Sequence, residues 1–204
     1  MSEKSKSSAS AIEEDQTNAA QRRAQGDFVR GVSGFRHAIG DVDFPAEPDR
    51  YHLFVAFNCP WSHRASLARG ILGLENAITM DVAFPSRTNE DDPVAPNLWE
   101  FNPDRISTIT GNVLSECTNE TGTGKNLRLT REIYGLEGSD EQSVPILYDK
   151  KQNRIVNNES AEIIRMLDRW ASALGSEMPD GERPELYPEA QFLRNEIETL
   201  NELI

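Results

Sequence analysis

The chain has 204 residues, a length that predicts one to two domains. Its 34 acidic and 21 basic residues give a formal charge of −13, so it lacks the basic surface with which proteins bind duplex nucleic acid or anionic lipid. The longest apolar run, residues 53–57, is too short to cross a bilayer, so no membrane partner is expected.

Cysteine usage and the N-terminal segment indicate the compartment. Two cysteines do not make a disulfide framework. Residues 1–25 have no apolar core and carry four acidic residues, which argues against a secretory signal and against an acid-poor transit peptide. We therefore expect a soluble, cytoplasmic protein. Residues 1–27 contain only Met1 and Ile12 as large apolar residues, which predicts a disordered tail.

Residues 28–49 and the segment that follows predict an arm and then a folded domain. Large apolar residues lie between glycines and prolines in 28–49, as in an irregular arm on a domain surface. Residues 51–57 are aromatic and β-branched, typical of a buried strand. Pro60 suits the first position of a helix, and apolar residues at helical spacing follow as far as Leu74. With a second strand at 77–84, this is a βαβ unit with parallel strands.

The middle of the chain is less regular. Residues 86–125 are polar and rich in turn formers, which predicts a long loop. A helix is expected at 126–134, and the short apolar runs 144–148 and 154–156 flank a polar turn, as in a β-hairpin. Asn158 or its neighbour then caps a helix that ends near Trp170. This order of elements predicts an α/β fold with a thioredoxin-like domain (βαβ-α-ββα) over residues 50–170.

The C-terminal part predicts a linker and one more helix. Residues 171–187 contain glycine and proline near their end, and residues 188–204 place apolar side chains on one helical face. That pattern is interrupted at residue 204 without a helix-stop signal. The expectation is that the chain is a fragment, or that a partner covers the face.

Cys59 is the candidate catalytic residue. It lies where the first strand ends and the first helix begins, and a thiolate at this end of a helix is stabilised by the helix dipole and backbone N–H groups. Cys59-Pro60-Trp61-Ser62 is a C-x-x-C motif with serine in the second position, so an adduct on Cys59 must be resolved by an outside thiol, such as glutathione. The alternative is that Cys59 is a buried small hydrophobe.

Other residues carry weaker signals. His63 and Arg64 either add positive potential near the thiol or are ordinary surface residues of the helix, and Cys117 in the polar loop has no positional signature. Val144-Pro145 opens a strand, and a cis bond there would leave the Val144 backbone free for a peptide-like ligand, although most such bonds are trans.

Glu159 and Ser160 are further candidate site residues, at the start of the last helix of the domain. These two residues either hold the ends of a γ-glutamyl group or form a plain helix cap.

Taken together, several segments resemble the glutathionyl-hydroquinone reductases, the Xi class of glutathione transferases. The motifs Cys-Pro-Trp-x-His-Arg and Asn-Asn-Glu-Ser-x-Glu-Ile-Ile-Arg-Met are its specific part. The resemblance covers residues 26–170 and rests on segments 50–53, 59–64, 73–78, 131–134, 144–147 and 155–167, with 26–30 and 44–48 resembling the family's N-terminal arm.

The resemblance implies a glutathione-dependent thiol transferase. Cys59 would attack the sulfur of a glutathionylated hydroquinone, and a second glutathione would release the mixed disulfide. Glutathione would be a cosubstrate rather than a permanently bound cofactor, and no metal is implied. The residues that the resemblance assigns to glutathione are Trp99, which Phe101 follows as in the family, and Arg131, Val144 with Pro145, Glu159 and Ser160.

Two departures from the family pattern bear on function. The loop 86–125 is longer and more polar than its counterpart, and only the first helix (188–204) of the family's helical C-terminal domain is present. That domain builds the hydroquinone pocket and the contacts of a homodimer. Two alternatives therefore stay open: an omega-like transferase with thioltransferase or dehydroascorbate reductase activity, and a non-catalytic transferase-like scaffold.

Overall fold

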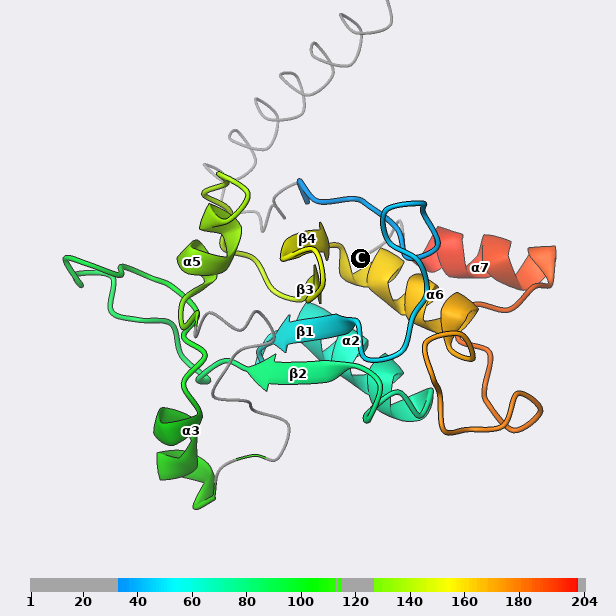
Figure 1. Ribbon diagram of the computed structural model, residues 1–204, viewed down its shortest axis with the longest axis horizontal. Coiled ribbons are helices and arrows are strands. Elements are labelled where there is room, and N and C mark those ends of the chain that lie inside the picture. The colour runs from blue at the N-terminus through cyan, green and yellow to red at the C-terminus, as the bar shows by residue number, and fades with distance from the viewer. Residues whose placement is uncertain (1–32, 113, 115–126, 202–204) are drawn as a thin grey trace, which may run out of the picture. The chain divides into compact units, whose positions relative to one another are not determined.

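The computed structural model describes residues 33–112, 114 and 127–201. The expected tail at 1–27 and Cys117 lie outside these residues. The described chain is built around a four-stranded sheet in the order β2-β1-β3-β4 (Figure 1). Its strands are β1 (Tyr51–Val55), β2 (Thr79–Val82), β3 (Ile146–Asp149) and β4 (Arg154–Asn157). As predicted, β1 and β2 are parallel and β3 and β4 form an antiparallel hairpin.

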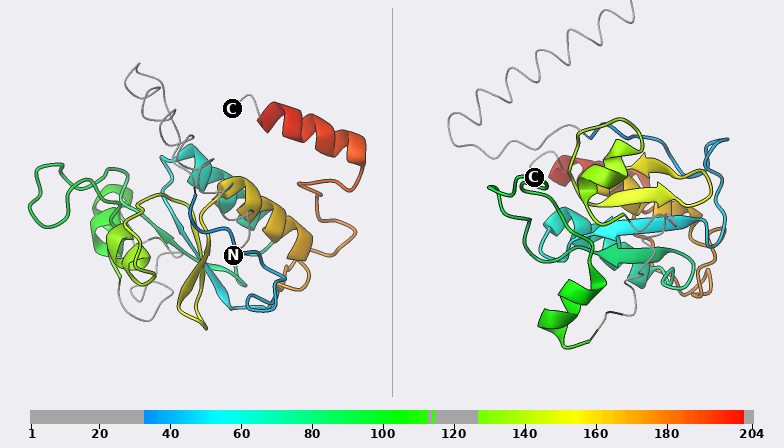
Figure 2. Two further views of the ribbon diagram at one scale, coloured as in Figure 1. Left: turned by 90° about the horizontal axis from the view of Figure 1, so that it is seen from above. Right: turned by 60° about the vertical axis from the view of Figure 1, so that its left-hand side comes forward.

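Two helices cover one face of the sheet. α2 (Pro60–Ile71) connects β1 to β2, and α6 (Ser160–Trp170) follows β4. They lie side by side across the sheet (Figure 2). Leu53 and Val55 of β1 point into the core beneath them, whereas Phe54 points into a second apolar cluster on the opposite face. The predicted thioredoxin-like α/β fold is confirmed.

The opposite face of the sheet is covered by α5 (Thr130–Gly135) and the segment around Trp99. One helix here departs from the prediction: α3 (Pro103–Thr110) lies within the stretch expected to be a loop. The Asn102 side chain accepts a hydrogen bond from the N–H of Arg105, and Pro103 occupies the first turn. α3 has only eight residues, and most of them are polar. Its apolar pattern is therefore too short to distinguish a helix from the polar loop around it in the sequence.

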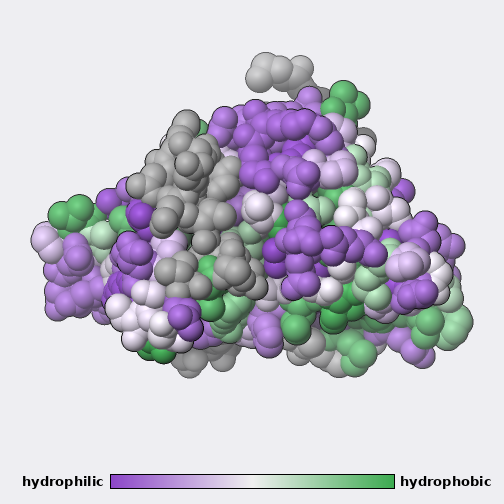
Figure 3. Space-filling view, turned by 60° about the horizontal axis from the view of Figure 1, so that its bottom comes forward, coloured by the Kyte–Doolittle hydropathy of each residue, from purple (hydrophilic) through white to green (hydrophobic). Residues whose placement is uncertain are grey.

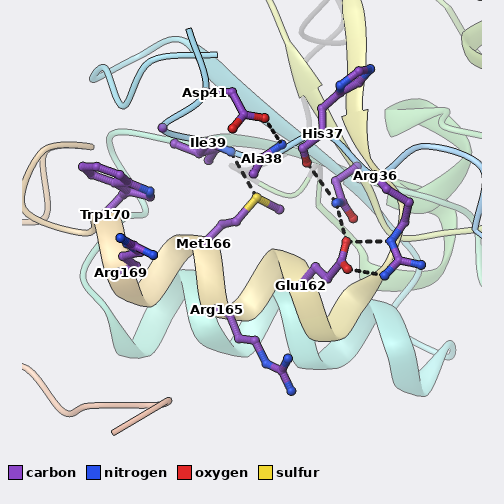
Figure 4. Close-up of a pocket in the computed structure, with 12 residues that line it drawn as sticks. Arg36, His37, Ala38, Ile39, Asp41, Glu162, Arg165, Met166, Arg169 and Trp170 are labelled. Carbon is purple, nitrogen blue, oxygen red and sulfur yellow. Dashed lines mark hydrogen bonds and ion pairs between the residues drawn. The ribbon is translucent and has the colours of Figure 1, made fainter. Parts of the chain in front are cut away.

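Residues 33–49 contain no helix and no strand of the sheet, and this arm runs along β4 and across α6 (Figure 4). Arg36 bridges Asn157 at the edge of the sheet, and its guanidinium pairs with Glu162 of α6. The N–H of Ile39 lies 3.1 Å from the sulfur of Met166. A groove of about 420 Å³ remains between the arm and α6, and none of the predicted site residues lines it.

The C-terminal part contains no helix or strand over residues 171–187, followed by α7 (Gln191–Asn201). Arg165 of α6 forms an ion pair of 2.6 Å with Glu198 of α7. Leu193 and Ile197 are half-buried, and Leu200 is exposed. The domain boundaries proposed from the sequence stay predictions.

Hydrophilic side chains cover most of the described surface in the view of Figure 3, between scattered apolar patches. The exposed large apolar residues include Phe57, Leu67 and Ile71 at and beside α2. Within the described residues, no helix combines the length and apolar character that a membrane span requires.

Candidate active site

Cys59 is the N-cap residue of α2, and its backbone is extended. Its N–H donates to the Ala56 carbonyl and its carbonyl accepts from the His63 N–H, both at 2.9 Å. The side chain makes no capping hydrogen bond. The half-buried thiol therefore stands at the positive end of α2 without being used to hold the helix.

Val144 lies directly beside the thiol. The Cys59 sulfur is 3.6 Å from the Val144 carbonyl oxygen, within reach of a weak hydrogen bond donated by the thiol. The Val144–Pro145 peptide bond is cis. Both residues are buried and directly precede β3 in the sequence. Two segments 85 residues apart in the sequence thus meet at the end of β1.

Trp99 belongs to the same apolar cluster as Val144, and Cys59 packs against that cluster. The N–H of Thr130 donates to the Trp99 carbonyl at 3.1 Å, and Glu100 forms a bridge with Leu129. These backbone bonds attach the Trp99 segment to the start of α5. Trp99 is consequently buried, with 8% of its surface exposed.

Arg87 is a residue that the sequence interpretation did not single out. Its guanidinium carbon lies 4.7 Å from the centroid of the Trp99 ring, and Nη1 donates to the Asn97 carbonyl at 2.9 Å. Partial desolvation lowers the pKa of Arg87, and the charge on Cys59 acts in the opposite direction. The predicted topology could have indicated the loop that carries Arg87. Because β1 and β2 are parallel, the residues that follow each strand emerge at the same edge of the sheet.

The start of α6 brings Glu159 and Ser160 together. Glu159 is the N-cap residue, and its carboxylate accepts hydrogen bonds from the N–H of Ala161 and from the Ser33 hydroxyl, both at 3.2 Å. Ser160 is fully buried, and its hydroxyl has no hydrogen-bond partner among the described residues. Buried hydroxyls are nearly always paired, so the Ser160 hydroxyl keeps its hydrogen-bonding capacity at the start of α6.

The remaining sequence candidates lie elsewhere or stay apart from the thiol. Arg131 is on the exposed side of α5, where its charge helps to lower the pKa of Asp92 after the stronger effect of the Ala95 and Val94 N–H groups. His63 is exposed and Arg64 is half-buried on α2, and the described structure gives neither side chain a contact with the thiol. Of the described residues, no three His, Cys, Asp or Glu side chains gather as metal ligands would.

Comparison with known proteins supports a family assignment. The family model described as "Glutathione S-transferase, N-terminal domain" matches residues 58–170, more than half of the chain. The chain is 36% identical over 185 residues to glutathione S-transferase omega-like 2 of Schizosaccharomyces pombe, covering 87% of this chain and 51% of that protein. It is also 36% identical over 185 residues to the glutathionyl-hydroquinone reductase YqjG of Escherichia coli, covering 86% and 50%.

Solved structures agree with the sequence matches. The Xi glutathione S-transferase of Phanerochaete chrysosporium is 30% identical with a TM-score of 0.65, over 86% of this chain and 53% of that one. Glutathione-bound YqjG of Escherichia coli is 32% identical with a TM-score of 0.60, over the same shares. The chain spans about half the length of the curated relatives it matches. From its thioredoxin-like fold and these matches, the chain belongs to the glutathione S-transferase family and is similar to Xi-class transferases and to glutathionyl-hydroquinone reductases.

Proposed function

We propose that this protein is a glutathione-dependent thiol transferase that removes glutathione from glutathionyl-hydroquinones, with Cys59 as the nucleophile. The observation that carries the proposal is the position of the Cys59 thiol, at the first turn of α2 and 3.6 Å from the Val144 carbonyl. A thiolate at this position is stabilised by the α2 N-terminus, and thiolates are the nucleophilic form of cysteine.

The proposed reaction has two thiol steps. The Cys59 thiolate attacks the sulfur of the glutathionyl-hydroquinone, an S–S bond forms, and the carbon–sulfur bond breaks. Its electron pair goes to the ring carbon, which takes up a proton and leaves as hydroquinone. A second glutathione thiolate then attacks the mixed disulfide, releasing oxidised glutathione and the Cys59 thiolate. The substrate carbon gains the two electrons that the two glutathione sulfurs lose when they form the disulfide, so electrons balance without another oxidant.

The proposed glutathione site extends from Cys59 to α6. The Val144 backbone would pair with the peptide part of glutathione, and Glu159 would bind the γ-glutamyl ammonium group. The Ser160 hydroxyl and the first N–H groups of α6 would bind the γ-glutamyl carboxylate, as anions bind at helix N-termini. The unpartnered Ser160 hydroxyl and the intermediate exposure of Glu159 support this arrangement.

Trp99 is proposed to contact glutathione beside the thiol, supported by its membership of the cluster that Cys59 packs against. Arg131 is proposed to contribute from α5. The glutathione-bound structure of YqjG supports glutathione as the cosubstrate of this family. Glutathionylated quinones as second substrate and a homodimer rest on the resemblance, and a cytoplasmic location rests on the cysteine count and the N-terminal composition. All three stay predictions.

A second candidate function is omega-like thioltransfer or dehydroascorbate reduction. It is favoured by the similarity to a relative named omega-like 2. Both functions use the same Cys59 chemistry, so substrate turnover must distinguish them. A reductase of the first kind turns over a glutathionyl-hydroquinone, whereas an omega-like enzyme turns over a glutathione mixed disulfide or dehydroascorbate. A non-catalytic scaffold would turn over none of them.

The deciding experiment is intact-mass spectrometry after incubation with oxidised glutathione. We expect one glutathionyl group on the wild type and on Cys117→Ser, the matched control for the second cysteine, and none on Cys59→Ser. Reduced glutathione should remove the adduct. An adduct on folded Cys59→Ser, or none on folded wild type, would refute the proposed role of Cys59.

A further inference from the structure

We propose that Arg87 is a positioning residue of the thiol site, whose guanidinium, held against Trp99, stabilises Cys59 as the thiolate. The inference rests on the proposed function, since it assigns a role within the same site. It is argued from the path of two loops, from the contacts that hold the guanidinium, and from the charges around the sulfur.

The two loops that carry Cys59 and Arg87 are tied together. The N–H of Ala83, just after β2, donates to the Val55 carbonyl at the end of β1 at 2.7 Å. The Asn58 side-chain amide then donates to the Pro85 carbonyl at 2.9 Å. Asn58 precedes Cys59 directly and Pro85 lies two residues before Arg87. The parallel strands and this amide bond therefore bring both loops to one edge of the sheet.

The guanidinium of Arg87 is held on two sides. Its carbon lies 4.7 Å from the centroid of the Trp99 ring, and Nη1 donates to the Asn97 carbonyl. Arginine carries five N–H donors on a planar group, so these contacts leave donors available for an anion. Trp99 itself is buried in the cluster against which Cys59 packs. The guanidinium is thus held against the ring of a residue that belongs to the cluster beside Cys59.

The charges near the sulfur favour Arg87 over its neighbours. On α2, His63 is exposed and Arg64 half-buried, and the described structure gives neither a contact with the thiol. Asp92 in the loop that carries Arg87 is bonded by the Val94 and Ala95 N–H groups and faces Arg131.

Arg87, in contrast, lies on the Trp99 ring at the sheet edge to which the Asn58–Pro85 hydrogen bond ties the Cys59 loop. Desolvation lowers the pKa of Arg87, and the charge of Cys59 acts in the opposite direction. A nearby cation favours the charged form of a thiol, and partial exclusion of water strengthens the effect.

The test measures the rate at which Cys59 reacts with iodoacetamide as a function of pH, in a Cys117→Ser background where Cys59 is the remaining cysteine. Iodoacetamide is small and uncharged, so the rate reports the thiolate fraction. Arg87→Gln should move the midpoint of the rate profile up by about 0.5 to 1 pH unit, which lowers the rate below the midpoint about three- to tenfold. Arg87→Lys, which keeps the charge, should restore most of the rate.

Arg169→Gln is the charge-matched control, since Arg169 is exposed in the last turn of α6. It should leave the profile unchanged. The dependence on salt is a second measurement, made without changing Arg87. At a pH below the midpoint of the rate profile, higher ionic strength should slow alkylation of Cys59 when Arg87 is present and have little effect in Arg87→Gln.

An unchanged alkylation profile in folded Arg87→Gln, with only the KM for glutathione raised, would overturn the inference and make Arg87 a ligand-binding residue. This outcome is distinct from failure of the proposed function. If Arg87→Gln shifts the alkylation profile but the wild type forms no glutathionyl adduct, the role of Arg87 stands and the transferase proposal fails.

Discussion

Ser62 occupies the position at which a dithiol motif would carry its second sulfur. It is the third residue of α2 and fully buried, and its hydroxyl has no hydrogen-bond partner among the described residues. Because serine cannot form a disulfide, an adduct on Cys59 persists until an outside thiol attacks it. The one-thiol chemistry proposed for Cys59 therefore depends on serine at position 62.

Ser62→Cys should convert the site from one-thiol to two-thiol chemistry. We expect that oxidised glutathione leaves the wild type with one glutathionyl group, whereas Ser62→Cys ends with an internal disulfide and no adduct. The second thiol lies one helical turn from Cys59, and its attack is intramolecular. Intact mass separates the two products. Ser66→Cys, one turn further along α2, is the control and should keep its glutathionyl group; a stable adduct on Ser62→Cys would contradict the argument.

At the scale of the element, the start of α6 is built by the arm as well as by its own cap. The Asn158 side chain accepts from the Phe35 N–H at 3.3 Å and donates to the hydroxyl of Tyr134 at 3.0 Å. The Ser33 hydroxyl donates to the Glu159 carboxylate at 3.2 Å. The arm thus fixes the direction of the two residues proposed to hold the γ-glutamyl group, while the groove of Figure 4 lies further along the same helix.

Ser160→Ala separates ligand binding from helix stability. Removing a buried hydroxyl that lacks a partner should leave the free energy of unfolding unchanged or raise it by up to about 1 kcal/mol. Losing one hydrogen bond to bound glutathione should weaken binding about tenfold. Urea denaturation and calorimetric titration measure the two effects.

Thr130→Ala is the matched control for Ser160→Ala, because Thr130 is also buried and its hydroxyl also lacks a hydrogen-bond partner among the described residues. Because a buried methyl group is lost as well, Thr130→Ala should lower the urea midpoint more than Ser160→Ala. It should leave glutathione affinity unchanged. Equal glutathione affinity in Ser160→Ala and wild type would remove Ser160 from the site.

Elements with a clear period could be predicted from the sequence, and contacts between loops could not. β1, α2, the β3–β4 hairpin and α6 carry strand or helix patterns, and the position of Cys59 follows from the strand end and Pro60 alone. Val144 could be proposed from its proline. Arg87 could not, because its relation to Trp99 arises from the pairing of β1 with β2 and from a loop of irregular backbone, neither of which has a period in the sequence.

At the scale of the whole molecule, three tyrosines anchor the two apolar clusters around the sheet. Tyr51 donates to the Pro45 carbonyl at 2.7 Å, Tyr134 to the Ser143 carbonyl at 3.0 Å, and Tyr148 to the side chain of Asn153 at 3.4 Å. Burial raises the pKa of each phenol above its ordinary value, and that of Tyr148 to about 12. Each phenol therefore holds its proton more tightly in the folded chain than in the unfolded chain.

The raised pKa of Tyr148 makes the folded chain less stable as the pH rises into the alkaline range. An unfolded tyrosine loses its proton near pH 10, whereas Tyr148 keeps its proton in the folded chain up to about pH 12. Between these values the unfolded state binds fewer protons, so the free energy of unfolding falls as pH rises. Urea midpoints should decline from about pH 10 upward, and Tyr148→Phe should decline less steeply while matching the wild type at pH 7. Equal slopes in the two proteins would show that Tyr148 does not contribute.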